Sequence, residues 1–233
     1  MSAAVANPML DLSARLWMFD FDNTLVALEE TVDWAASRLE LEQMLRQAGC
    51  PADLFERFPR GNLALYNELL HQLRTGAFTP AIPGEELLAR ASNIIESHEI
   101  AGVDRANPLP GAFELLSELA DRQLQTVIVT SNSSRTVYRW LARVRLVYTV
   151  KTVVGRDWLL PLKPAADSLL RALDRTRVEA GAAIFVGDSN ADRLAARAAG
   201  IRFIAIAPNW PWPEDAAAVF STPAELLRNL RAS

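Results

Sequence analysis

Cysteine is almost missing from this chain of 233 residues, because Cys50 is the only one. A single cysteine excludes an internal disulfide bond and is typical of proteins in a reducing compartment. Apolar runs long enough to span a membrane are also missing, and no basic stretch followed by a long apolar segment marks a signal peptide. These absences predict a cytoplasmic protein that does not act in a membrane.

Basic clusters are lacking as well, and the formal net charge is −4. Surfaces that bind nucleic acid polymers are strongly basic, so this balance argues against such a partner. Hydrophobic residues make up 50% of the chain and charged residues 22%. That composition belongs to a globular protein, and the length allows one large domain or two smaller ones. The sequence leaves the oligomeric state open.

Lysine is scarce in this sequence. Only Lys151 and Lys163 are lysines among the 24 basic residues that carry a full charge, and the others are arginines. The guanidinium of arginine is planar and forked, whereas the ammonium of lysine is compact. Each lysine is therefore a candidate for a role that arginine cannot fill.

Short apolar runs rich in β-branched residues alternate with helical patterns along most of the chain. The first run begins at Leu16, and four more are predicted as strands: Thr126–Thr130, Val150–Val154, Ala183–Val186 and Phe203–Ile206. Helices are predicted after Pro110-Gly111 and over residues 135–142, 164–173 and 191–199, the last with Gly200 as its C-cap. This alternation predicts an α/β fold with a mostly parallel sheet.

Residues 29–104 differ from the rest because they contain no convincing strand. Three amphipathic helical patterns occupy this segment, and turn signals rich in proline and glycine separate them. We therefore predict a helical cap at residues 29–104, inserted after the first strand. The remaining residues, 1–28 and 105–233, are predicted to form the core domain.

Carboxylates follow two of the predicted strands. Asp20 and Asp22 end the first run, and Asp188 and Asp192 follow the run that ends at Val186. In open α/β folds, ligands bind beyond the carboxyl ends of the strands. Clustered carboxylates raise one another's pKa values unless a cation lies between them, and Mg²⁺ prefers such oxygen ligands. This edge of the sheet is a candidate metal site.

Groups that suit an anion are expected at the same edge. Thr130 and Ser131 begin a run of hydroxyl and amide side chains at the start of a predicted helix, and Lys163 lies just before another. Each feature alone has a structural explanation, because Ser and Asp also cap helices and Lys-Pro is common in loops. Together they supply oxygen ligands, an anion pocket and a cation, which phosphoryl transfer requires.

The order of these motifs resembles that of the haloacid dehalogenase-like hydrolases over nearly the whole chain. Four motifs carry the resemblance: DFDNT at Asp20–Thr24, VIVTS ending at Ser131, LKP around Lys163, and GDSNAD ending at Asp192. The resemblance implies a Rossmann-like three-layer core with a helical cap inserted after the first motif. This agrees with the pattern of strands and helices.

The resemblance also implies catalytic roles. Asp20 would be the nucleophile that forms an aspartyl-phosphate, and Asp22 would protonate the leaving oxygen and then take a proton from water. Lys163 would place a compact positive charge beside the nucleophile and the phosphate.

A metal and a phosphate site are implied in the same way. Mg²⁺ would be held by Asp20, Asp188 and the backbone carbonyl of Asp22. Asp192 would bind the metal through water or orient Lys163. The phosphate oxygens would be held by Thr130, Ser131 and Lys163.

Hydrolysis of a phosphate monoester of a small metabolite is the predicted activity. The dehalogenases of the family have no acid at the position of Asp22, and its phosphonate-cleaving members use a cap lysine that residues 29–104 lack. A phosphomutase on the same core and a catalytically idle binding or scaffold protein are the alternatives. Four polar residues of the cap are candidates for substrate specificity: Arg57, Arg60, Asn62 and His71. Two tryptophans after the last predicted strand, Trp210 and Trp212, either border the site or pack.

Overall fold

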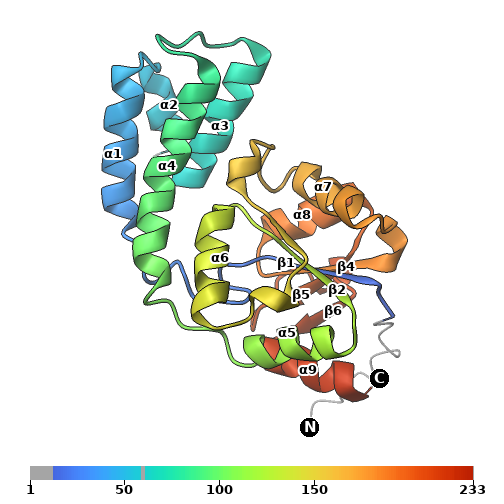
Figure 1. The fold of residues 1–233 in the computed structure, drawn as a ribbon. Helices are drawn as coiled ribbons and strands as arrows, with labels where there is room; N and C mark the ends of the chain where they lie inside the picture. Colours follow the sequence, from blue (N-terminus) through green and yellow to red (C-terminus); the bar gives the residue numbers. More distant parts are fainter. Residues whose placement is uncertain (1–12, 59–60, 233) are drawn as a thin grey trace.

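A parallel sheet lies at the centre of the computed structural model, which describes residues 13–58 and 61–232 (Figure 1). Six strands pair in the order β3-β2-β1-β4-β5-β6, and every pairing is parallel. The strands are β1 (Leu16–Phe19), β2 (Gln125–Val129), β3 (Thr152–Val154), β4 (Ala183–Gly187), β5 (Arg202–Ile206) and β6 (Ala218–Phe220). With β1 central, its carboxyl end lies between those of β2 and β4.

Helices cover both faces of the sheet, because successive strand residues point to opposite sides. Trp17 and Phe19 of β1 pack in one apolar cluster with residues of three helices, and Leu16 and Met18 pack in a second cluster with residues of two others. The first face carries α5 (Ala112–Asp121), α6 (Ser134–Arg143) and α9 (Pro223–Ala232), and the second carries α7 (Asp167–Thr176) and α8 (Asn190–Ala199). This is a three-layer α/β fold.

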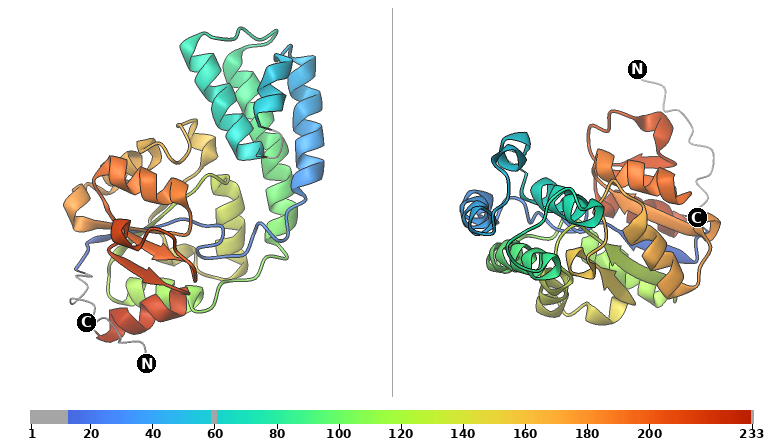
Figure 2. Two further views of the ribbon diagram at one scale, coloured as in Figure 1. Left: turned by 180° about the vertical axis from the view of Figure 1, so that it is seen from behind. Right: turned by 90° about the horizontal axis from the view of Figure 1, so that it is seen from above.

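Four helices between β1 and α5 form a group of their own, which stands to one side of the sheet in Figures 1 and 2. They are α1 (Trp34–Gln47), α2 (Ala52–Arg57), α3 (Asn62–Thr75) and α4 (Gly84–Val103), and a separate apolar cluster joins them. The two connections to the sheet run side by side. The Ala27 N–H donates to the Asn107 carbonyl, and the Leu109 N–H donates to the Leu25 carbonyl, each at 2.9 Å.

The α/β fold class predicted from the sequence is confirmed, with local differences. Residues 164–166 precede α7 because the Ala165 N–H bonds to the Leu162 carbonyl in a turn, so this helix begins at Asp167 rather than at Pro164. The short helix α2 and the three-residue edge strand β6 were not predicted, because segments of this length carry little periodicity. The division of the chain at residues 29 and 105 stays a prediction.

Over the described ranges, no helix combines the length and the apolar character that crossing a membrane requires. The most extended helix, α4, has 20 residues. Five charged residues, Glu85, Glu86, Arg90, Glu96 and Glu99, lie along this helix, which packs against α1 and α6. Its apolar face is therefore used for packing within the protein.

Candidate active site

A cleft of about 520 Å³ opens where the carboxyl ends of β1, β2 and β4 meet the helical group. Six residues that the sequence singled out line it from the sheet side: Asp20, Asp22, Thr130, Ser131, Lys163 and Asp188. They come from four separate loops, and the parallel pairing of the strands brings these loops to one edge. Asp192 lies behind this wall and contacts it through Lys163.

Lys163 joins two of the carboxylates. Its Nζ lies 2.5 Å from Asp20 Oδ1 and 2.5 Å from Asp192 Oδ1, and only 6% of its side chain is exposed. Burial disfavours the ammonium charge, but the Asp192 and Asp20 carboxylates more than offset it and raise the pKa of Lys163 above its usual range. The lysine therefore carries a fixed positive charge at the cleft wall.

Asp192 is committed to the protein on both of its carboxylate oxygens. Oδ1 pairs with Lys163, while Oδ2 accepts the Ser189 N–H at 3.0 Å and the Ser189 hydroxyl at 2.6 Å in a capping box that begins α8. The approach is close, since a Cβ at Gly187 would lie 2.7 Å from the Asp192 Cβ. This geometry favours orientation of Lys163 over metal binding for Asp192.

Three carboxylates crowd one another in this wall. Oxygen atoms of Asp20, Asp188 and Asp192 all lie within 4.8 Å of one another. Burial raises the pKa of Asp20 to about 6, although Lys163 opposes the shift, and burial together with the charges of Asp20 and Asp192 raises the pKa of Asp188 to about 8. Three carboxylates face one ammonium, so the ionised cluster carries two excess negative charges. A divalent cation with oxygen ligands fits this set.

Replacement of Asp188 tests this repulsion. Its folded pKa of about 8 lies above the ordinary value of 3.8, so the protein without metal loses stability as pH rises from about 4 towards 8. We expect Asp188→Asn, in chelator at pH 8, to be more stable than wild type by on the order of 1–3 kcal/mol, with little difference near pH 4. Thermal denaturation with and without Mg²⁺ measures this difference in stability. Mg²⁺ should stabilise only the wild-type protein. An Asp188→Asn protein less stable than wild type at pH 8 would contradict the inferred repulsion among the three carboxylates.

Asp22 follows Asp20 by two residues, past the end of β1, and lines the same cleft. Its Oδ1 accepts the backbone N–H groups of Leu28 and Glu29 at 2.8 and 2.9 Å. Burial raises the pKa of Asp22 to about 7, although these hydrogen bonds oppose the shift. A carboxyl group that titrates near neutral pH suits general acid and base catalysis. The turn that follows places Asn23 at a φ of 57°, a conformation that asparagine tolerates well.

The loop Thr130–Ser133, named the phosphate loop because the sequence predicts that it binds phosphate, follows β2 and leads into α6. Ser133 caps this helix, since its hydroxyl accepts the Thr136 N–H. The Thr130 hydroxyl donates to Asn132 Oδ1 at 3.0 Å and accepts the Asn132 N–H at 3.1 Å. Within the described residues, the backbone N–H of Ser131 donates to no protein acceptor, and Ser131 lines the cleft. This N–H is available to an anion. The Thr130 hydroxyl already donates to Asn132 Oδ1 and must break that hydrogen bond before it donates to an anion.

The helical group closes the cleft from the other side, and only part of that contribution was anticipated. Asn62, a sequence candidate and the first residue of α3, lines the cleft together with Leu63 and Ala64, which were not candidates. Trp34, at the start of α1, was missed because the sequence reading treated that helix as an apolar packing pattern. The two residues are joined because Asn62 Nδ2 donates to the backbone carbonyl of Trp34 at 3.1 Å.

Other candidates lie elsewhere. Arg57 forms ion pairs on the surface of α2 and α3, and His71 lines a separate hollow beside Pro161. Arg60 lies outside the described residues. Trp210 packs against Phe203 of the core with the two rings tilted, and Trp212 contacts the Trp210 ring edge-on, so neither tryptophan borders the cleft.

Cys50 and Lys151, which the sequence also singled out, both lie away from the cleft. Cys50 is buried, which raises the pKa of its thiol to about 11 and leaves it protonated. Lys151 is exposed, and its Nζ contacts Gln125 Oε1 at 2.6 Å at the edge of the sheet. Neither residue takes part in the cleft.

Comparison with known proteins agrees with this arrangement. The family model for haloacid dehalogenase-like hydrolases matches residues 17–206. A phosphoglycolate phosphatase of Pseudomonas fluorescens is 29% identical over 219 residues, which cover 94% of this chain and 78% of the relative. Phosphoglycolate phosphatase 1 of Pseudomonas aeruginosa is 30% identical over 199 residues, which cover 82% of this chain and 69% of the relative.

Solved structures share the fold. CbbY from Rhodobacter sphaeroides, crystallised with phosphate, superposes with a TM-score of 0.62 at 19% identity and covers 94% of this chain and 99% of its own. A hydrolase from Pseudomonas syringae gives 0.63 at 22% identity and covers 93% and 97%. The two Pseudomonas relatives are named as phosphatases, and the match over residues 17–206 shows that the chain belongs to the haloacid dehalogenase-like hydrolases.

Proposed function

We propose that this enzyme is a Mg²⁺-dependent phosphatase that hydrolyses a small phosphate monoester through an aspartyl-phosphate on Asp20. The observation that carries the proposal is the position of Lys163, which lies between Asp20 and Asp192 at 2.5 Å from each. A phosphate that approaches Asp20 therefore meets a fixed cation on one side. The free N–H of Ser131 in the phosphate loop supports a bound anion on the other.

The crowded carboxylates fit a magnesium ion. Asp20 and Asp188 would hold it with their side chains and Asp22 with its backbone carbonyl, while Asp192 is occupied by Lys163 and Ser189. When bound, Mg²⁺ supplies positive charge that offsets the repulsion between these carboxylates and the phosphate.

Proton and bond changes follow from the positions of two carboxyl groups. An Asp20 oxygen attacks phosphorus, and the bond between phosphorus and the ester oxygen breaks. Asp22, with a pKa of about 7, gives its proton to the leaving oxygen and then removes one from water. That water attacks phosphorus, the bond to Asp20 breaks, and inorganic phosphate leaves. Oδ1 of Asp22 accepts two backbone N–H groups, so the other oxygen, Oδ2, would carry the proton that is exchanged.

The substrate class is a small phosphorylated metabolite. A cleft of about 520 Å³ is large enough for a compact ester but not for a polymer. Relatives named phosphoglycolate phosphatase and the binding of phosphate or xylulose bisphosphate by CbbY make small phosphate esters the first compounds to test. Action in the cytoplasm is also part of the proposal, because a single cysteine is typical of a reducing compartment.

A panel of phosphate esters tests the function. We expect purified protein to hydrolyse at least one small ester with Mg²⁺, to lose the activity in chelator, and to regain it when Mg²⁺ is restored. Ca²⁺, which accepts larger and less regular coordination, should bind without supporting turnover. The release of inorganic phosphate measures the rate of hydrolysis under each condition. Uniformly low background rates would favour an idle binding protein, and isomerised phosphoester product without phosphate release would favour a phosphomutase.

A further inference from the structure

A fully buried ion pair joins the helical group to the phosphate loop. Arg156, in the short helix Arg156–Trp158 after β3, and Glu99 on α4 both have side chains that are 0% exposed. Arg156 Nη1 lies 2.8 Å from Glu99 Oε1, and Nη2 lies 3.1 Å from Oε2. Burying two charges is costly, so such a pair is stable only when its other hydrogen-bonding positions are also filled.

Arg156 fills all of its positions. Beyond Glu99, its Nε and Nη2 donate to the hydroxyl and the carbonyl of Ser92 on α4, at 3.2 and 3.3 Å. Its Nη1 also donates to the Ser131 carbonyl at 2.9 Å. The five N–H groups of the guanidinium are thus matched by five contacts, and one of them holds the peptide that follows Ser131.

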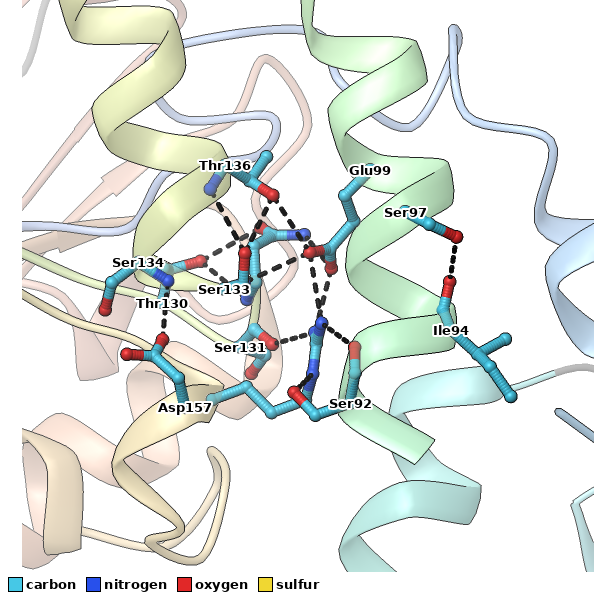
Figure 3. Close-up of polar contacts among 12 residues, drawn as sticks. Ser92, Ile94, Ser97, Glu99, Thr130, Ser131, Ser133, Ser134, Thr136 and Asp157 are labelled. Carbon is cyan, nitrogen blue, oxygen red and sulfur yellow. Dashed lines mark hydrogen bonds and ion pairs between the residues drawn. The ribbon is translucent and has the colours of Figure 1, made fainter. Parts of the chain in front are cut away.

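Glu99 is equally saturated, and its remaining partners belong to the phosphate loop and the helix that follows it (Figure 3). Its carboxylate accepts the Asn132 Nδ2 at 3.0 Å, the Ser133 N–H at 3.1 Å and the Thr136 hydroxyl at 3.2 Å. Three donors of this segment therefore depend on one carboxylate from α4. Neither Glu99 nor Arg156 lines the cleft.

Asn132 transmits the effect of Glu99 to the cleft. A carboxylate only accepts hydrogen bonds, so Asn132 must turn its NH₂ towards Glu99 and its Oδ1 towards Thr130. Thr130 then donates to Oδ1 and accepts the Asn132 N–H. The orientation of the Thr130 hydroxyl and of the Ser131 peptide is therefore set from outside the cleft.

We propose that Glu99 and Arg156 are positioning residues that hold the phosphate loop in its anion-binding shape and tie that shape to the docking of α4. The proposal rests on the proposed function, because it assigns the loop to the substrate phosphate. Glu99 acts through Asn132, and Arg156 acts through the Ser131 carbonyl and through the charge of Glu99.

The chain offers a matched control on the same two helices. Glu96, one turn before Glu99 on α4, pairs with Arg135 of α6 at 3.2 Å; its own side chain is 14% exposed, and that of Arg135 is 77% exposed. Solvent screens such a pair, so its removal has little effect. The two glutamates differ in burial and in their contact with the phosphate loop, while their helix is the same.

The experiment measures binding of inorganic phosphate by calorimetry in the presence of Mg²⁺, and Mg²⁺ binding alone. Glu99→Gln puts an NH₂ donor where loop donors converge, so we expect the phosphate Kd to rise by about tenfold or more. Mg²⁺ affinity should change by less than about twofold, because Asp20 and Asp188 lie outside the network. Glu96→Gln should leave both values within about twofold of wild type. If Glu99 had a purely structural role, its replacement would lower thermal stability and would change the phosphate and Mg²⁺ affinities to a similar extent.

A second variant keeps the test available should Glu99→Gln fail to fold. Asn132→Ala leaves the ion pair whole and removes the side chain that links Glu99 to Thr130 and that also lines the cleft, so it should also weaken phosphate binding. If Glu99 acts through Asn132, the double variant binds phosphate no more weakly than Asn132→Ala. Unchanged phosphate affinity in a folded Glu99→Gln or Asn132→Ala protein overturns the inference while leaving the phosphatase intact. Wild-type protein that binds no phosphate overturns the proposed function, and the inference with it.

Discussion

Asp20→Asn is expected to abolish turnover, by at least about a thousandfold, while the protein remains folded. An amide has nearly the shape of the carboxylate but lacks the nucleophilic oxygen that would form the acyl phosphate. Asp20 is also the carboxylate whose Oδ1 lies 2.5 Å from Lys163, so the amide weakens the hold on that ammonium. Steady-state hydrolysis of the best ester in the panel measures the loss, and thermal denaturation verifies the fold.

A trapping measurement separates loss of the nucleophile from general damage. Beryllofluoride mimics a phosphoryl group on a carboxylate, so ¹⁹F spectra of wild type with Mg²⁺ should show a bound species, and Asp20→Asn should show none. The exposed Asp174, paired with Arg171 on α7, provides a control in the form Asp174→Asn. Substantial hydrolysis by Asp20→Asn would show that the phosphoryl group is not carried by this residue.

Lys163→Arg is expected to cost roughly a hundredfold in kcat/KM although it keeps the charge, because a misplacement of about 1 Å can cost that much. The Nζ atom lies between single oxygens of Asp20 and Asp192. The second oxygen of Asp192 already accepts two hydrogen bonds from Ser189, so a forked guanidinium cannot pair with both oxygens of Asp192 without displacing them. Phe185 lies beneath the ammonium and limits the space for a longer side chain.

Lys151→Arg is the control for this comparison, since it changes the only other lysine in the same way. Its Nζ contacts an exposed glutamine at the sheet edge, so arginine should be accommodated without loss. Kinetics of both variants on one ester, with equal Mg²⁺, measure the difference. Activity of Lys163→Arg equal to wild type would mean that the scarcity of lysine has no catalytic basis and that the cation for the phosphate must be sought elsewhere.

The sequence by itself determined the order of strands and helices and the edge of the sheet that carries the charged residues. Buried strands and amphipathic helices leave a local apolar pattern, because each must turn one side to a core. Parallel strands then end at one edge, so Asp20, Thr130 and Asp188 were predicted to meet, and they line one cleft. Their catalytic and metal-binding roles stay predictions until the variants are measured.

Only the tertiary structure decided how the helical group meets that edge. Trp34 and Asn62 enter the cleft, and Glu99 reaches Arg156 across 57 positions of sequence. A helical pattern records which side of a helix is buried but not which partner buries it. A glutamate within such a pattern is ordinarily a surface residue, and its burial becomes favourable only when a distant arginine and three loop donors converge on its carboxylate. That convergence depends on docking between segments far apart in the chain, which local sequence does not encode.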